Sequence, residues 1–261
     1  MRDITARQIG IALTLTALAG IGLYAVLWAL GPDWAAYAPA TCTTTRCFCE
    51  LPRMGSLILQ PADSWSAFGY VAAGFLMIVL ARSRAWASAM PASFATMFGV
   101  TAIAVGLGSV LLHATLTLWG QFVDVLGMYL VGSFMVVSAL AKWRGIPDRA
   151  AMLLYVGLCA VLVSVLVVEP EARRYLFAVV LVTAIVIELA FARPKRRDVR
   201  LRYYLAGLLA KAVAFAIWNL DQNLVWCSPE SLIQGHAVWH LLGAVSIFLT
   251  FSYYRSETMK A

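Results

Sequence analysis

Residues 92–141 read ASFATMFGVTAIAVGLGSVLLHATLTLWGQFVDVLGMYLVGSFMVVSALA and contain a single Asp, Glu, Lys or Arg residue, Asp124. Two apolar runs, 92–116 and 121–141, are separated by only four residues, 117–120. Each run is long enough to cross a bilayer as a helix, which needs about 20 apolar residues. Because the connection is short, the two helices must be antiparallel neighbours. The stretch therefore predicts a transmembrane helical hairpin.

Apolar runs of this length recur along nearly the whole chain of 261 residues, of which 62% are apolar and 13% charged. A soluble domain usually has about 45–50% apolar and about 25% charged residues, so an ordinary water-soluble enzyme is excluded. In hydrocarbon the backbone satisfies its own polar groups only as helix or closed barrel. We expect an all-α, polytopic membrane helix bundle with eight spans, at roughly 8–30, 65–81, 92–116, 121–141, 150–168, 175–193, 201–220 and 236–254.

The distribution of positive charge predicts the orientation. Of the 20 Lys and Arg residues, 15 lie on one side of the predicted bundle and Lys211 lies within a span. Four lie on the other side: Arg46, Arg53, Arg173 and Arg174. Short loops rich in Lys and Arg stay in the cytoplasm, so both termini are expected there. The net charge of +7, including the basic run 193–202, is explained by this topology, and we expect no nucleic-acid or protein partner.

The first span, 8–30, resembles a secretory signal but is too long for one, since a signal core has about 7–15 apolar residues. We expect a retained anchor helix. Residues 1–44 would then form this anchor and the start of an external loop, and residues 45–261 would form a domain with the other seven spans. The short loops favour a bacterial inner membrane protein.

Five cysteines indicate the redox environment. Cys42, Cys47 and Cys49 lie in the first external loop and Cys227 in the last, whereas Cys159 lies within a span. Four cysteines on the outer side indicate an oxidising compartment, where disulfides persist. They allow three pairings, of which we favour Cys49 with Cys227 and Cys42 with Cys47; free thiols are the alternative.

The chain has only three histidines, His113, His236 and His240, and all three lie near the outer ends of predicted spans. His236 and His240 are four residues apart, which places both imidazoles on one helix face, one turn apart. Three neutral imidazoles with one open position form the usual ligand set of a catalytic zinc ion. The sequence therefore predicts a metal site in the outer leaflet.

Two polar side chains are expected beside these histidines. Ser109 lies one turn before His113 on the same helix face, and the hairpin 117–120 returns Asp124 to the depth of His113. An ionisable residue within a span is a functional candidate by default. The alternative readings are that the histidines form interfacial hydrogen bonds, that Ser109 bonds its own backbone and that Asp124 caps its helix.

Four segments carry a family resemblance: GSVLLH at 108–113, GQFVD at 120–124, IWNLD at 217–221 and GHAVWH at 235–240. Together with Cys227 they resemble the alkaline ceramidases, integral-membrane zinc amidases of a superfamily that includes the adiponectin receptors. The resemblance covers about residues 45–255. It implies zinc on His113, His236 and His240, an acid/base at Asp124 and an oxyanion-stabilising hydroxyl at Ser109. It also implies the Cys49–Cys227 disulfide and a lipid amide such as ceramide as substrate, taken from the bilayer.

The chain departs from this family in two ways. The family has a seven-helix core, so the span 8–30 is an addition. The alkaline ceramidases also hold calcium through several acidic and amide side chains, of which this chain keeps only two acids, Glu50 and Asp63. These leave an incomplete calcium site.

Asp221 and Asn219 lie at the end of the seventh span. We expect them either to hydrogen-bond to a zinc-bound histidine on the side away from the metal or to cap their helix.

Lys211 is a further charge within a span. It lies nine residues from Arg202, about 13–14 Å along the helix axis, and hence near mid-membrane. We expect an ion pair between Lys211 and Glu188 of the sixth span. A retinal Schiff base on Lys211 is the alternative.

Three other functions remain open. A zinc-stabilised membrane receptor or scaffold of the same superfamily would hold the metal without hydrolysis. A haem protein would place iron between histidines of different spans, but it leaves Asp124 and Ser109 without a role. A transporter would use Asp124, Glu188 and Lys211 as a polar path.

Overall fold

The computed structural model describes residues 4–192 and 199–258. These residues form helices and loops with no strand, so the predicted all-α fold is confirmed. Most basic residues of the predicted topology signal at 193–202 lie outside the described residues, as do Arg2 and Lys260.

Six long apolar helices are continuous: α1 (Ala6–Leu30), α4 (Ala92–Thr115), α5 (Leu118–Arg144), α6 (Asp148–Val168), α8 (Leu201–Gln222) and α9 (Gly235–Ser256). The predicted span 65–81 consists of α2 (Pro61–Ser66) and α3 (Phe68–Ala81). The predicted span 175–193 is α7 (Arg173–Val186), which continues as a π-helical turn over Ile187–Phe191. In the described part of the chain every predicted span is thus helical, and seven are long and apolar enough to cross a membrane.

The helices of the predicted spans 65–81 and 121–141 begin about one turn earlier than predicted because polar groups cap them. The Glu50 carboxylate accepts hydrogen bonds from the backbone N–H groups of Ala62 and Asp63, both at 2.9 Å, and so satisfies the first turn of α2. At the start of α5, the Thr117 hydroxyl accepts from the backbone N–H of Gly120 at 3.2 Å. These caps add one turn to each helix at the same end of the bundle.

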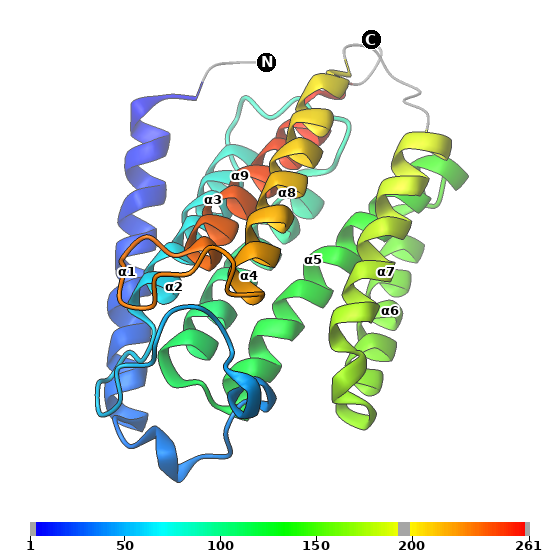
Figure 1. Cartoon of the computed structure of the whole chain (residues 1–261). Helices are drawn as coiled ribbons and strands as arrows, with labels where there is room; N and C mark the ends of the chain where they lie inside the picture. The colour runs from blue at the N-terminus through cyan, green and yellow to red at the C-terminus, as the bar shows by residue number, and fades with distance from the viewer. Residues whose placement is uncertain (1–3, 193–198, 259–261) are drawn as a thin grey trace.

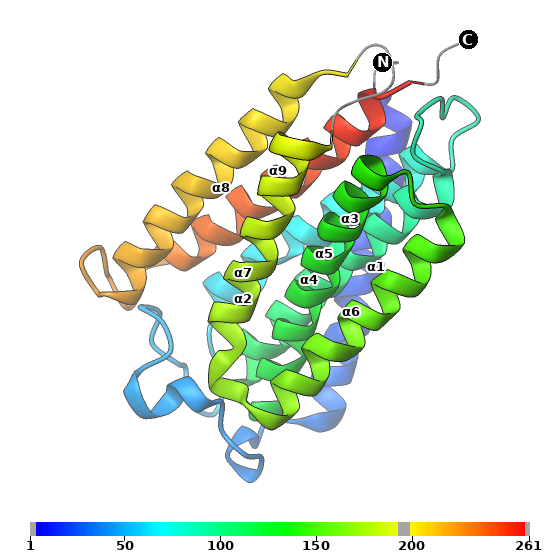
Figure 2. The ribbon, with the colours of Figure 1, turned by 90° about the vertical axis from the view of Figure 1, so that its right-hand side faces the viewer.

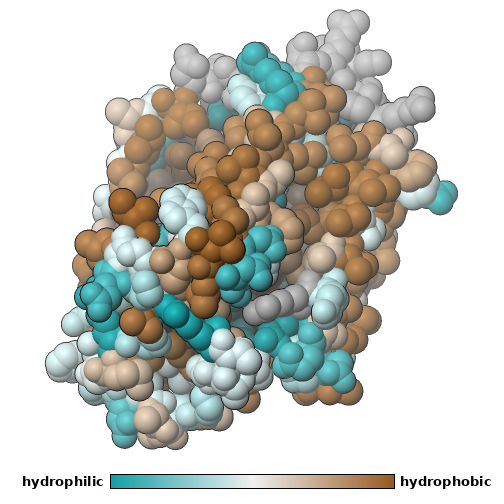
Figure 3. All heavy atoms as spheres, in the orientation of Figure 1, coloured by the Kyte–Doolittle hydropathy of each residue, from teal (hydrophilic) through white to brown (hydrophobic). Residues whose placement is uncertain are grey.

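The helices form one bundle in which α4 contacts both α3 and α5, and α9 contacts both α3 and α8. Helices α6 and α7 pack against α5, and α1 packs against α3 (Figures 1 and 2). Helix α1 begins and α9 ends at one end, which we call the basic end (Figure 1). The opposite end carries residues 31–60 and 223–234 with both disulfides, and we call it the disulfide end. Figure 3 shows apolar residues along the helices and polar residues gathered toward the disulfide end.

Glycines bring the backbones of α3, α4 and α5 into contact. A Cβ atom at Gly99 of α4 would lie 2.7 Å from the carbonyl oxygen of Gly74 of α3, and one at Gly74 would lie 2.5 Å from the carbonyl oxygen of Gly99. On the other side of the hairpin, a Cβ at Gly127 of α5 would lie 2.8 Å from the backbone of Val105. Small residues at helix contacts allow this close approach in membrane proteins.

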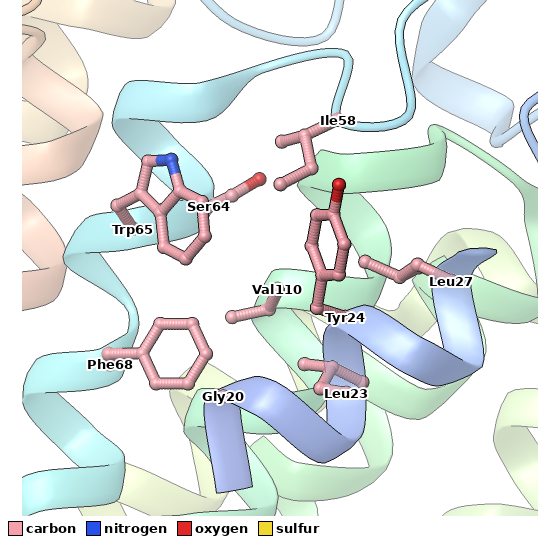
Figure 4. Close-up of a pocket in the computed structure, with 9 residues that line it drawn as sticks. All are labelled: Gly20, Leu23, Tyr24, Leu27, Ile58, Ser64, Trp65, Phe68 and Val110. Atoms are coloured by element: carbon pink, nitrogen blue, oxygen red, sulfur yellow. The ribbon is translucent and has the colours of Figure 1, made fainter. Parts of the chain in front are cut away.

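Helix α1 is the most lightly packed of the long helices, with only Ala12 and Leu27 buried. It approaches α3 where a Cβ at Gly20 would lie 3.4 Å from the Phe68 ring. A shallow, mainly apolar pocket lies between α1 and helices α2, α3 and α4 (Figure 4). It includes none of the three histidines, so α1 lies beside the site-bearing helices rather than within the site.

The predicted ion pair between Lys211 and Glu188 is wrong. Glu188 is buried, pairs with Lys142 of α5 and accepts a hydrogen bond from the Tyr253 hydroxyl at 2.7 Å. The Lys142 ammonium also lies 4.8 and 4.7 Å from the ring centroids of Tyr253 and Tyr254. The reason is depth: Glu188 and Lys142 both lie near the basic end of their helices, whereas Lys211 lies ten residues into α8.

The glycine contact predicts a selective loss of stability. We expect Gly99→Ala to lower the free energy of unfolding by about 1–3 kcal/mol, because its Cβ would collide with the α3 backbone. Gly157→Ala in α6, where no atom lies within 4 Å of the added Cβ, is the control and should be neutral or slightly stabilising. Thermal unfolding in detergent measures both, and equal midpoints would argue against the contact.

Candidate metal centre

The three histidines meet at the disulfide end. His113 lies near the end of α4, and His236 and His240 lie in the first turns of α9; all three are buried. One nitrogen from each ring lies within 4.8 Å of the others. The ring centroids are 4.8 Å apart for His113 and His236, 5.1 Å for His113 and His240, and 4.6 Å for His236 and His240. The spacing can therefore place three imidazole nitrogens around one ion.

The outward-facing ring nitrogens of two histidines are already hydrogen-bonded. Nδ1 of His240 lies 3.0 Å from the carbonyl oxygen of Asp63 and 2.9 Å from the Ser66 hydroxyl. Nδ1 of His113 lies 3.0 Å from the side-chain oxygen of Gln60, whose amide nitrogen donates to the Glu50 carbonyl at 2.7 Å. Carbonyl oxygens only accept, so both Nδ1 atoms donate, and each Nε2 atom carries the lone pair that a metal needs; that of His240 faces the Ser109 hydroxyl.

The start of α9 is held by Asp221 of α8. Its buried carboxylate accepts hydrogen bonds from the backbone N–H of His236 at 3.1 Å and of Cys49 at 3.2 Å. A Cβ at Gly235 would lie 3.0 Å from the Asp221 Cβ, so glycine allows the two helices to meet here. Asp221 thus links α8, α9 and the first long loop through backbone groups, and it fixes where His236 lies.

Asp63 lies beside His113, with its carboxylate oxygen Oδ2 3.7 Å from Nδ1 of the ring. The side chain is fully buried, and in the described part of the chain neither carboxylate oxygen has a hydrogen-bond partner. A buried carboxylate in this state is costly unless a positive charge compensates it. Three imidazole nitrogens that can act as metal ligands, with this negative charge beside them, fit a divalent cation such as zinc.

Phe48 packs directly on the histidine cluster. Its ring centroid lies 4.5 Å from that of His113 and 4.2 Å from that of His236. The neighbouring residues are both in disulfides, Cys42–Cys47 and Cys49–Cys227, and both pairings are the ones that the sequence favours. The loop that covers the cluster at the disulfide end is therefore covalently restrained. Cys159 is a free thiol.

Asp124 and Ser109 lie next to this cluster, where α4 and α5 are in backbone contact. A Cβ at Gly108 would lie 3.0 Å from the Asp124 Cα, which places the two helices side by side at this depth. The Ser109 side chain lies beside the Asp124 carboxylate, and its Oγ lies 3.0 Å from Nε2 of His240. A carboxylate, a hydroxyl and an imidazole from three helices thus lie next to one another.

Tyr70 of α3 is a neighbour of the site that the sequence analysis does not identify. Its ring centroid lies 6.4 Å from that of His240, and it interacts electrostatically with Asp124. A Cβ at Gly243 would lie 1.8 Å from the Tyr70 hydroxyl oxygen, so the hydroxyl occupies space that only glycine leaves open on α9. A signal was present in the sequence, because Gly243 follows His236 and His240 on the same helix face.

Two predicted residues have other roles. The Asn219 side-chain amide donates to the carbonyl oxygen of Phe215 on its own helix at 2.7 Å. Glu50, considered with Asp63 for calcium, caps α2 with both carboxylate oxygens. Burial raises the pKa of Glu50 above its ordinary value, while the two backbone N–H groups oppose this shift.

Comparison with known protein families shows that the family described as Ceramidase matches residues 53–260. The match begins after α1 and includes the histidines, Asp124 and Ser109. No match was found among curated proteins.

The geometry predicts that the purified protein binds about one zinc ion per chain at the three histidines. His240→Ala should lose the metal, because two imidazoles are too few ligands for tight binding. Asp63→Asn should weaken zinc affinity by roughly 10- to 100-fold through loss of the neighbouring charge. Elemental analysis and competition with a chelator measure both effects.

Cys159→Ser serves as the control for zinc bound at the free thiol. Full zinc content in His240→Ala, or loss of zinc in Cys159→Ser, would place the metal elsewhere.

Proposed function

Because the chain belongs to the Ceramidase family, we propose that it is a zinc-dependent hydrolase that cleaves the N-acyl amide bond of ceramide or a related lipid amide. The observation that carries the zinc assignment is the cluster of three buried imidazoles, with the unpartnered carboxylate of Asp63 beside it. The neighbouring side chains Asp124 and Ser109 lie next to His240 of this cluster and supply the groups for amide hydrolysis.

His113, His236 and His240 would hold the ion, which when bound lowers the pKa of water and polarises the amide carbonyl. Asp124 takes a proton from the attacking water and returns it to the leaving amine nitrogen, so one carboxylate serves as base and then as acid. Ser109 lies between Asp124 and His240 and is placed to donate to the carbonyl oxygen as negative charge develops there.

The surroundings favour a lipid substrate. The site lies within an integral, multi-pass bundle of long apolar helices. It lies near the disulfide end, at the depth of the first turns of α9. A scissile bond at this depth suits a lipid whose amide lies near the headgroup and whose acyl chain remains among the helices.

We place the disulfide end and the site in the outer leaflet of a bacterial inner membrane, with both termini cytoplasmic, since disulfides persist in oxidising compartments. Residues 1–44 would be an added anchor outside the catalytic domain.

Substitution of the proposed acid/base separates catalysis from metal binding. We expect Asp124→Asn to keep its zinc and lose about 10²- to 10⁴-fold in kcat, because the amide cannot take a proton. Ser109→Ala should lose about 10²- to 10³-fold in kcat. The control is Ser133→Ala, which alters a buried serine about 13 Å from Asp124 along the axis of α5. Wild-type turnover in Asp124→Asn would remove Asp124 from the reaction.

Product analysis tests the hydrolysis itself. Zinc-loaded protein incubated with a mixed lipid extract in ¹⁸O-labelled water should release fatty acid that carries the label in its carboxylate, together with the free amine. Protein stripped of zinc should release neither, and mass spectrometry detects both products. Bound zinc without release of fatty acid from any lipid amide would instead indicate the receptor or scaffold function.

A further inference from the structure

Lys211 is a cation within an apolar helix that the proposed reaction does not use. Tyr204 and Trp218, seven residues before and after it, lie on the same face of α8. Both contact α9, with ring centroids 5.1 Å apart for Tyr204 and Tyr253 and 6.0 Å apart for Trp218 and Trp239. Lys211 therefore faces α9 and is partly buried.

The ammonium group of Lys211 lies next to the candidate metal centre. Its Nζ is 3.8 Å from the centroid of the Trp239 ring, and Trp239 directly precedes the proposed ligand His240. Lys211 is also close enough to His240 for the two side chains to interact electrostatically. A positive charge thus stands beside the site at which a divalent cation is proposed.

No negative charge in the described part of the chain compensates Lys211. The ion pairs there involve other residues, with Glu188 taken by Lys142, and the Lys211 ammonium donates no hydrogen bond there. An unpaired charge within a span is costly, and a metal ion beside it would add repulsion. A bound anion would relieve both, and the three N–H donors of the ammonium are available to hold it.

We propose that Lys211 binds an anionic group on the substrate, and that the substrates are N-acyl amino acids. This inference rests on the proposed amide hydrolysis. Beyond its carbonyl the acyl half of a lipid amide is hydrocarbon, so the charge must lie on the amine half. One ammonium matches the single charge of a carboxylate, whereas a phosphate monoester carries a charge of about −1.5 to −2 at pH 7.

The reaction balances without a further reactant. The C–N bond of the amide breaks, and water gives its hydroxyl to the acyl carbon and a proton to the nitrogen. The products are a fatty acid and a free amino acid. The carboxylate of the amino acid is unchanged, so Lys211 acts in recognition and takes no part in bond breaking.

The test compares N-acyl glycine with N-acyl ethanolamine of the same acyl chain, which differ in carrying a carboxylate or a hydroxymethyl group. Zinc-loaded protein in a neutral detergent should favour N-acyl glycine by roughly 10- to 100-fold in kcat/KM, the value of a hydrogen bond to a charged group. Lys211→Met keeps an unbranched side chain against Trp239 and should lose this preference, whereas Lys211→Arg should retain most of it.

Arg202→Met is the matched control, because it removes a cation that lies 5.2 Å from the Tyr203 ring centroid on the same helix, near the basic end. It should keep the wild-type preference. Equal kcat/KM for the two lipids in the wild type, or a preference that survives Lys211→Met, would overturn the proposal.

A binding measurement separates this inference from the proposed function. Dissociation constants for both lipids are measured in Asp124→Asn, with and without Lys211→Met. If the wild type releases fatty acid neither from these two lipids nor from the mixed lipid extract, the proposed function fails, but tighter binding of N-acyl glycine that depends on Lys211 still supports anion recognition. Equal dissociation constants for the two lipids would contradict it.

Discussion

The backbone of α4 touches the backbones of two neighbouring helices, and the candidate site depends on this contact. Gly99 meets Gly74 of α3, and Gly108 meets the backbone of Val123 and Asp124 of α5. Larger side chains at these glycines would move the helix axes several ångströms apart, because each would place at least a methyl group between the two backbones. Ser109 and Asp124 lie side by side because Gly108, the residue before Ser109, has no side chain to separate the two backbones.

The second half of the site is positioned by groups outside the reaction. Asp221 holds the first turn of α9 and the backbone of Cys49, while Asp63 and Gln60 orient two imidazoles from the α2 side. Most of these contacts involve backbone groups, whose positions are fixed once the helices have formed. The histidines therefore meet in a rigid frame, which lowers the reorganisation needed when an ion binds.

The spans and the depth of the histidines could be predicted from the sequence, because they follow from spacing along single helices. Gly243 indicates space on the histidine face of α9, but the identity of Tyr70 as the residue that fills it could not be predicted, since this depends on how α3 packs against α5 and α9. The pairing of Lys211 with Glu188 failed for a related reason. Composition shows that both lie within spans, but only the packing shows that Glu188 lies nearer the basic end, beside Lys142. Contacts between helices distant in sequence leave no local periodicity to read.

Phe48 has a consequence for how molecules reach the histidines. Its ring covers two of the imidazoles from the loop side, and the cysteines on either side of it are each tied by a disulfide. A long-chain molecule that approaches from this direction meets a restrained aromatic ring, which favours entry sideways, between helices, from the bilayer. Turnover would then follow the mole fraction of substrate within the membrane and not its total amount in solution. Diluting the substrate with inert lipid would therefore lower the rate of turnover at constant bulk concentration.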